Sequence, residues 1–150
     1  MINVLYVDDE RHNLTAFKAA FRRDFNIFIA ESAEEGIRFL QQNTIHVILS
    51  DQRMPKMTGI EFFESILAIF PDPIRILITG YTDINAVIDA INRGQVYKYL
   101  TKPWHDQEIR IFIDKAYEVY TLRKENTELT NKLINANQKL EFLARQALLS

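Results

Sequence analysis

The stretch HVILSDQRMP, residues 46 to 55, runs from apolar residues into an acid and then into a loop closed by proline. Its first half, HVILS, is rich in aliphatic and β-branched side chains and predicts a short buried strand. Asp51 follows that strand immediately. A strand-end acid taken alone is more often a helix cap or a solvated loop residue than a nucleophile, so its neighbours in the fold decide its role.

Four more runs of the same character occur along the chain, separated by segments of helical length and period. The expected strands are residues 2–7, 26–30, 46–50, 74–79 and 96–100, and the expected helices are residues 14–21, 33–40, 59–70 and 83–93. Strands that alternate with helices and are almost continuously apolar predict a parallel sheet covered on both faces. The expected fold class is therefore α/β, with a doubly wound five-stranded parallel sheet.

The ends of several helices are marked by residues that satisfy free backbone groups. Two S/T-x-x-E sequences predict capping boxes, in which each side chain accepts a hydrogen bond from the other residue's N–H group. A polar residue caps a later helix, a glycine ends it, and two prolines stop the helix before the fourth strand. These residues are Ser32 with Glu35, Thr58 with Glu61, Thr82 or Asp83, Gly94, and Pro71 with Pro73.

Polar side chains stand at the ends of four expected strands, where doubly wound folds bind their ligands. They are Asp8, Asp9 and Glu10 after the first strand, Asp51 after the third, Thr79 after the fourth, and Thr101 and Lys102 after the fifth, with Gly80 next to Thr79 and Pro103 next to Lys102. Crowded carboxylates repel one another and favour a divalent cation, and hard oxygen ligands suit Mg²⁺. With Mg²⁺ and Lys102 holding phosphate oxygens, Asp51 is a candidate nucleophile that accepts a phosphoryl group.

The acidic pair, the central acid, the hydroxyl residue and the Lys-Pro step resemble, in order and spacing, the receiver domains of two-component response regulators over about residues 1 to 120. The resemblance implies a flavodoxin-like sheet of order 2-1-3-4-5 and phosphorylation of Asp51 by a partner histidine kinase. The stretches SDQRMP, TGYTD and YLTKPW resemble receivers joined to cyclic-dinucleotide phosphodiesterases, other signalling enzymes or kinases.

The resemblance also implies a role for each residue of the site. Asp9 and Asp51 ligate Mg²⁺ directly, Asp8 acts through water, and the backbone carbonyl of Arg53 completes the metal site. Thr79 is the switch hydroxyl and the Gly80 amide binds a phosphoryl oxygen.

Three further expectations come from the same resemblance. Lys102 pairs with the phosphoryl group, and the Lys102–Pro103 bond is cis, as X-Pro bonds alone can readily be. Tyr99 swings inward when Thr79 moves. Gln52, Arg53 and Tyr81 occupy positions that tune the lifetime of the phosphoryl group in the family.

Residues 106–149 contain neither glycine nor proline, and Asp106 with Glu108 suits the positive end of a helix. One continuous helix is expected, of roughly 65 Å at about 1.5 Å per residue, far longer than a domain with a radius of about 15 Å. Its first turns carry an apolar stripe that fits the sheet. The stripe consists of Ile109, Phe112, Ile113, Ala116 and Tyr120.

Beyond that stripe the apolar residues follow a heptad, which predicts a parallel coiled-coil homodimer over residues 119–147. The a positions are Val119, Asn126, Leu133, Leu140 and Ala147, and the d positions are Leu122, Leu129, Ala136 and Leu143. A single Asn at an a position fixes register and favours two parallel strands, and Glu118 at g can pair with Arg123 at the next e position. A helix that packs on its own or another domain is the alternative.

We therefore expect residues 1–120 to form the receiver domain and residues 121–150 the coiled-coil helix, which leads to an output domain absent from this chain. The 150 residues are 47% hydrophobic, which is enough for a core, and they include no cysteine, so thiolate metal sites and disulfides are excluded. Residues 1–105 carry 11 Lys and Arg against 13 Asp and Glu, and residues 106–150 carry 7 against 7, so no nucleic-acid clamp is expected. No secretory signal or membrane span is recognisable, and a cytoplasmic location is expected.

Two other classes of function remain open from the residues alone. A scaffold or dimerisation protein would carry the same acids in an inactive pocket. A Mg²⁺-dependent phosphatase with aspartate chemistry needs a D-x-D pair on the first strand, which Asp8-Asp9 does not supply. His12, His46 and His105 lack metal-ligand spacing and are expected in solvent or loops, and Trp104 is expected to pack at the start of the last helix.

Overall fold

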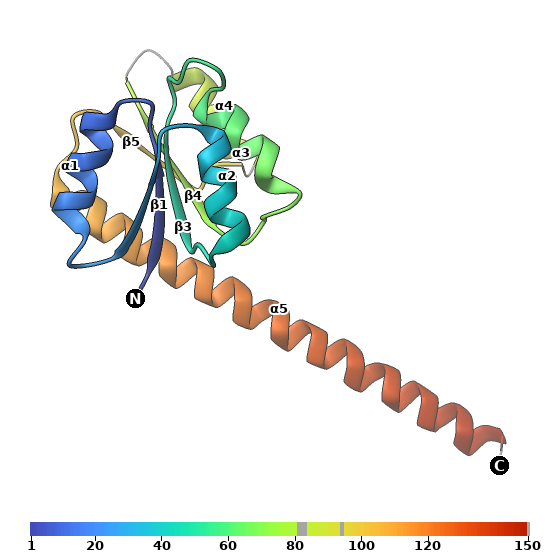
Figure 1. The fold of residues 1–150 in the computed structure, drawn as a ribbon. Helices are drawn as coiled ribbons and strands as arrows, with labels where there is room; N and C mark the ends of the chain where they lie inside the picture. Colours follow the sequence, from blue (N-terminus) through green and yellow to red (C-terminus); the bar gives the residue numbers. More distant parts are fainter. Residues whose placement is uncertain (81–83, 94, 150) are drawn as a thin grey trace.

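The computed structural model describes residues 1–80, 84–93 and 95–149. Strands and helices alternate along the chain (Figure 1). The strands are β1 (Asn3–Val7), β2 (Asn26–Ala30), β3 (Val47–Asp51), β4 (Ile74–Thr79) and β5 (Lys98–Thr101). The helices are α1 (Arg11–Phe21), α2 (Ala33–Gln42), α3 (Gly59–Leu67), α4 (Ile84–Asn92) and α5 (Asp106–Leu149).

The five strands form one parallel sheet in the order β2-β1-β3-β4-β5, which confirms the expected fold class and strand order. The order reverses between β1 and β3. In a sheet of this kind the crevice for ligands lies at that reversal, beyond the carboxyl ends of the strands.

Helices cover both faces of the sheet (Figure 1). Helices α1 and α5 pack on one face, where Val4 and Tyr6 of β1 point, and helices α2, α3 and α4 pack on the other, where Leu5 and Val7 point. Because successive side chains of a strand point to opposite faces, a strand buried on both sides is mostly apolar. The central strand β3 is buried at each of its positions.

The predicted helix starts are partly right. Thr58 and Glu61 form a complete capping box at the start of α3. Ser32 accepts a hydrogen bond from the Glu35 N–H group at 3.2 Å, but the Glu35 carboxylate accepts from the N–H group of Glu31 instead of that of Ser32. The second box is therefore wrong in one of its two bonds. The capping and end residues proposed at Thr82, Asp83 and Gly94 lie outside the described residues.

Helix α5 is one continuous element of 44 residues, of which the first turns pack on the sheet. The buried residues Ile109, Ile113 and Ala116 belong to the core under α1, as the apolar stripe predicted. From Leu122 onward every described residue of the helix is exposed, and the helix projects away from the sheet (Figure 1).

Two contacts at the amino-terminal edge of the sheet hold α5 where it leaves the domain. The imidazole of His46 meets the rings of Tyr117 and Tyr120 edge-on, at centroid distances of 5.1 and 4.9 Å. Lys124 forms an ion pair with Asp72 at 3.0 Å. His46 is therefore a half-buried loop residue that packs on α5, which its isolated place in the sequence does not reveal. Within the described residues no helix is both long and apolar enough to cross a membrane.

Candidate functional site

Three carboxylates meet at the reversal of strand order. One oxygen each from Asp8, Asp9 and Asp51 lies within 4.8 Å of the other two. The sheet register explains this approach, because Val7 pairs with Ser50, Asp8 follows directly on β1 and Asp51 is the last residue of β3. Residues 43 positions apart in the sequence are thus neighbours at one edge of the sheet.

Asp8 is fully buried and accepts hydrogen bonds on both oxygens. The Tyr6 hydroxyl and the Asn13 amide donate to Oδ2 at 2.8 and 3.0 Å, and the Glu10 N–H group donates to Oδ1 at 2.9 Å. Burial and the neighbouring Asp8 carboxylate raise the pKa of Tyr6, so its hydroxyl remains a donor at physiological pH. Neither Tyr6 nor Asn13 was singled out from the sequence.

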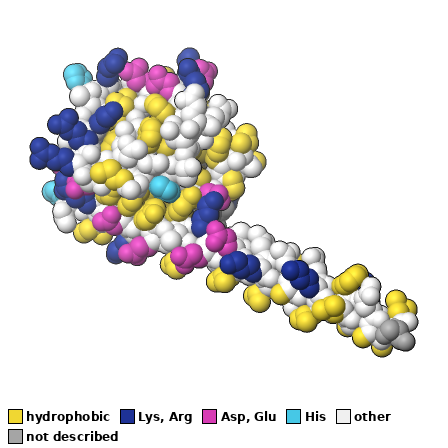
Figure 2. Space-filling model, turned by 60° about the horizontal axis from the view of Figure 1, so that its bottom comes forward, with side chains coloured by type: hydrophobic (Ala, Val, Ile, Leu, Met, Phe, Trp, Pro, Cys, Tyr) yellow, Lys and Arg dark blue, Asp and Glu magenta, His cyan; other side chains and the backbone are white. Residues whose placement is uncertain are grey.

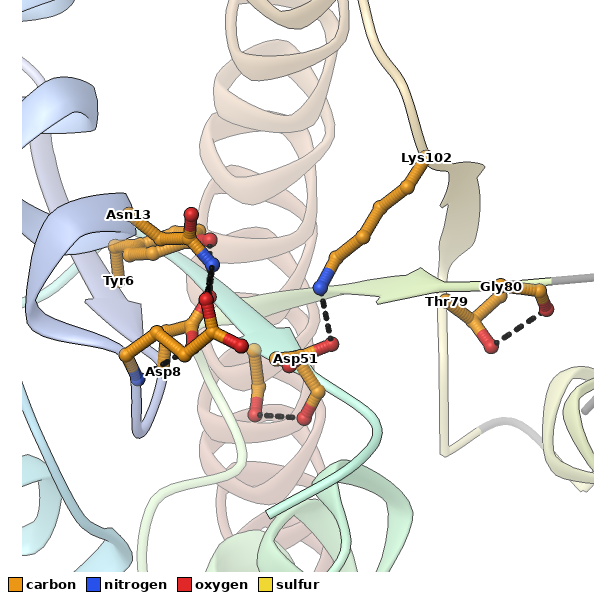
Figure 3. A network of polar contacts seen from close by, with 9 residues as sticks. Tyr6, Asp8, Asn13, Asp51, Thr79, Gly80 and Lys102 are labelled. Carbon is orange, nitrogen blue, oxygen red and sulfur yellow. Dashed lines mark hydrogen bonds and ion pairs between the residues drawn. The ribbon is translucent and has the colours of Figure 1, made fainter.

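Lys102 supplies the positive charge of the site. Its ammonium lies 3.1 Å from Oδ1 of Asp51, and the Asp51 side chain is 9% exposed against 37% for Lys102 (Figure 3). Burial raises the pKa of Asp51, the bond and charge of Lys102 oppose that rise, and the charges of Asp8 and Asp9 add to it. The pKa of Asp51 rises on balance because burial, with the charges of Asp8 and Asp9, outweighs the effect of the Lys102 ammonium.

The switch residues expected at the end of β4 stand close by but are not joined to Asp51. The buried Thr79 hydroxyl donates to the Gly80 carbonyl at 3.1 Å. The Lys102 N–H group donates to the Thr79 carbonyl at 3.0 Å, which ties the ends of β4 and β5 together. The Lys102–Pro103 peptide bond is cis. Figure 3 shows Thr79 and Gly80 on the far side of Lys102 from Asp8.

Tyr99 lies on β5, half-buried against the core under α3 and α4. It lines a groove between α4 and α5 with a volume of about 690 Å³. The other lining residues are Ile84, Ile91, Tyr97, Lys98, Leu100, Thr101, Glu108 and Phe112. The Tyr99 side chain therefore borders the groove on one side and packed core side chains on the other, and the expected inward movement would be toward the core.

The loop after Asp51 is held by two residues whose roles the sequence did not reveal. Gln52 is buried, and its side-chain carbonyl accepts from the Ile60 N–H group at 3.0 Å, so it faces α3 and not the acids. Gly59 begins α3, and a Cβ atom there would lie 2.6 Å from the Asp51 carbonyl oxygen and 2.7 Å from Leu77 Cδ1. Only glycine lets α3 approach Asp51 this closely. The Arg53 side chain is exposed in the same loop.

The predicted seam residues on α5 are exposed along the projecting part of the helix. Leu122, Leu129, Leu133, Leu140 and Leu143 are each between 59% and 65% exposed. Figure 2 shows apolar side chains along this part of the helix. Val119, the first a position, packs instead against the core of its own domain. Asn126, Ala136 and Ala147 are exposed like the leucines.

The parallel sheet order, the acids at the strand ends and the paired lysine are the features expected of a receiver domain, and comparison with known families gives the same class. The profile of the response regulator receiver domain family matches residues 4–114, and the chain belongs to this family. It is 34% identical to the hydrogenase transcriptional regulatory protein HoxA of Bradyrhizobium diazoefficiens over 122 residues, which are 81% of this chain and 25% of that protein.

Further relatives extend the likeness through most of α5. HoxA of Cupriavidus necator is 33% identical over 147 residues, which are 98% of this chain and 30% of that protein. The chain thus spans between a quarter and a third of the length of these relatives.

Solved structures show the same fold. A receiver domain from Clostridium thermocellum matches with a TM-score of 0.77 at 30% identity, over 81% of this chain and 98% of that chain. A chain described as adenylate cyclase from Rhodopirellula baltica matches with a TM-score of 0.83 at 30% identity, over 87% of this chain and 97% of that chain.

Proposed function

We propose that this receiver accepts a phosphoryl group on Asp51 from a histidine kinase and passes the change along α5, as a dimer, to an output unit. The observation that carries the proposal is the placement of Asp51. Its carboxylate lies 3.1 Å from the Lys102 ammonium and within 4.8 Å of two further carboxylates, at the edge of the sheet where ligands enter.

The proposed reaction is a transfer between two side chains. An oxygen of Asp51 forms a bond to phosphorus while the bond from phosphorus to the kinase histidine nitrogen breaks, and that nitrogen keeps the electron pair. Because a free carboxylate is the nucleophile, Asp51 must be ionised when it reacts. Lys102 favours the ionised form and lies close enough to pair with a phosphoryl oxygen.

The three carboxylates fit a divalent cation by their chemistry and spacing. They offer hard oxygen atoms, one exposed at Asp9 and two buried, in the pattern that Mg²⁺ prefers. Asp9, Asp51 and the Arg53 carbonyl would hold the ion, with Asp8 acting through water. Bound there, Mg²⁺ supplies positive charge for the phosphoryl oxygens.

The switch is proposed to begin at Thr79. Its hydroxyl now donates to the Gly80 carbonyl, and a phosphoryl group on Asp51 offers new acceptor oxygens that compete for this donor, while the Gly80 amide binds another of them. Movement of Thr79 opens the space that Tyr99 can fill. The groove between α4 and α5 then changes shape, which biases a two-state equilibrium.

Two partners follow from the same proposal. The exposed leucines of residues 119–147 pair with a second copy of the chain in a parallel coiled coil, in which Asn126 meets its counterpart. The two HoxA relatives are described as transcriptional regulatory proteins, and α5 is the connection to an output unit of this or another signalling class. A cytoplasmic location belongs to the proposal, and neither a membrane nor nucleic acid is a direct partner of the receiver.

Phosphoryl uptake from acetyl phosphate tests the chemistry. The intact chain with Mg²⁺ is expected to gain one phosphoryl group by mass spectrometry, and Asp51→Asn is expected to gain none. Lys139→Gln, on the exposed part of α5, serves as a matched surface control. Equal uptake by Asp51→Asn would contradict the role of Asp51, and no uptake by the intact chain would favour a scaffold with an inactive pocket.

A further inference from the structure

Asp8 is the acid of the site whose hydrogen bonds are most fully used by the protein itself. A carboxylate offers about four lone-pair directions on its two oxygens. Tyr6 and Asn13 occupy Oδ2 at 2.8 and 3.0 Å, and the Glu10 N–H group occupies one direction of Oδ1 at 2.9 Å. The direction that remains free is therefore on Oδ1.

The position of Tyr6 is itself fixed by packing. Its side chain is fully buried in the core between β1 and α1, and its ring stacks on Phe17 with centroids 4.4 Å apart and planes 12° from parallel. Turning the hydroxyl away from Asp8 would break this stack. In Figure 3, Asp8 lies between Tyr6 and Asn13 on one side and Asp51 on the other.

We propose that Tyr6 and Asn13 are positioning residues of the cation site: they hold Oδ2 of Asp8 and leave Oδ1 as the oxygen that meets the cation or its water. The inference rests on the proposed function, because the cation site is part of it. Neither residue contacts the cation or the phosphoryl group in this account. Both act by fixing the orientation of a buried carboxylate that reaches β3 across the sheet edge.

The physical basis is the free energy needed to orient the Asp8 carboxylate when the cation binds. A carboxylate with one oxygen released can rotate and offer either oxygen, so cation binding must then restore an orientation that the folded protein no longer provides. Residues that orient metal ligands typically change metal affinity by about 10- to 100-fold when they are replaced. Tyr6 and Asn13 donate to the same oxygen, so each partly compensates for loss of the other.

Calorimetric titration of the full chain with MgCl₂ tests the inference without any phosphoryl transfer. Tyr6→Phe removes the hydroxyl and keeps the ring, and its Mg²⁺ dissociation constant is expected to rise about tenfold. Tyr120→Phe removes a hydroxyl at the opposite edge of the sheet, beside His46, and is expected to bind Mg²⁺ like the parent chain. Equal affinity in Tyr6→Phe and the parent chain would overturn the inference.

A second variant keeps the test valid if Tyr6→Phe fails to fold. Asn13 is half-buried on α1, and Asn13→Ala removes the second donor to Oδ2 together with a longer hydrogen bond, at 3.3 Å, to the Glu10 carboxylate. It is expected to weaken Mg²⁺ binding several-fold, and the double variant is expected to lose more than the product of the two single effects. Parent-like affinity in Asn13→Ala would count against the inference.

The Asp8→Asn background separates positioning from general destabilisation. If Tyr6 acts through the Asp8 carboxylate, Tyr6→Phe changes Mg²⁺ affinity in the parent chain but not in Asp8→Asn. An equal loss in both backgrounds would mean a structural role and would overturn the inference. If the parent chain does not bind Mg²⁺ at all, the cation site of the proposed function is refuted. If the parent chain binds Mg²⁺ and the variants bind it equally well, only the role of Tyr6 and Asn13 is refuted.

Discussion

The Lys102 ammonium lies 3.1 Å from Oδ1 of Asp51, although Asp51 ends β3 and Lys102 follows β5, with β4 between these strands. The pairing brings a flexible, half-exposed cation to a buried acid that two other carboxylates repel. The site is therefore short of positive charge before any cation or phosphoryl group arrives. The effects expected of substitutions at Asp51 and Lys102 follow from this excess of negative charge.

Asp51→Asn is expected to raise the free energy of unfolding at pH 7 in the presence of EDTA. The variant removes a buried charge whose pKa the fold raises, mainly by desolvation. Since the folded-state pKa lies above the unfolded value, the folded chain binds the proton more readily. The loss of stability that the Asp51 charge causes in the parent chain is complete above the folded-state pKa of Asp51, and it disappears as pH falls to about 4. Urea titrations at pH 7 and pH 4.5 check this, and a variant less stable than the parent at pH 7 would contradict it.

Lys102→Met is expected to strengthen Mg²⁺ binding and to weaken any response to phosphorylation. The methionine removes an ammonium that competes with a divalent cation for Oδ1 of Asp51. A change of about 1 kcal/mol in charge interaction near the surface corresponds to about fivefold in affinity. Calorimetry with MgCl₂ measures the effect, and Lys98→Met, at the start of β5, is the control. Weaker Mg²⁺ binding in Lys102→Met would show that the lysine assists the cation.

Gly59→Ala is expected to destabilise the chain by about 1–3 kcal/mol, as overpacking in a close-packed core does. The added Cβ would meet the Asp51 carbonyl oxygen at 2.6 Å, and backbone atoms cannot give way as a flexible side chain can. Gly80→Ala is the matched control, because no atom lies within 4 Å of a Cβ placed there. Thermal unfolding followed by circular dichroism compares the two variants, and equal melting temperatures would refute the steric account.

The chain is expected to lose stability as pH falls below neutrality, in part because of His46. Burial and the positive amino terminus lower the pKa of His46, so the unfolded chain binds the proton more readily than the folded one. Stability is therefore complete above the ordinary histidine pKa of about 6.5 and declines as pH falls toward the lower folded-state value.

A variant of His46 isolates this contribution. His46→Gln keeps a side-chain acceptor for the Asn3 N–H group, which donates to Nδ1 at 2.9 Å. It is expected to flatten the change of the urea midpoint between pH 7.5 and pH 5.5. His105→Gln, at an exposed position, is expected to keep the slope of the parent chain, and the same slope in His46→Gln would refute the prediction.

The periodicity of the apolar residues and the polar residues at the strand ends were enough to predict the sheet. They were also enough to predict that Asp51, Asp8 and Lys102 lie at one edge of it. Each of these features is local in the sequence, and the parallel topology then places the strand ends together. The roles of Tyr6, Gly59 and Gln52 could not be predicted in the same way. A tyrosine inside an apolar strand is predicted to be a core residue. The hydrogen bond from its hydroxyl to Asp8 depends on the path of the chain just after β1, which the sequence pattern does not specify. The closeness of Gly59 to Asp51 likewise depends on how α3 packs against β3 and β4, which no local pattern encodes.

The coiled-coil seam gives the sharpest test of the proposed dimer, since two adjacent residues on α5 make opposite predictions. Leu133 occupies an a position and is 65% exposed, whereas its neighbour Ile134 lies outside the seam and is 48% exposed. Leu133→Asp is expected to raise the dimer dissociation constant at least about a hundredfold, because an unpaired charge would be buried between two helices. Ile134→Asp places the same charge in solvent and is expected to leave the dimer intact. Sedimentation velocity over a range of concentrations distinguishes these outcomes.

A parent chain that remains monomeric throughout would refute the proposed dimer, and equal effects of the two variants would refute the seam. Either result would favour a helix that packs on another domain.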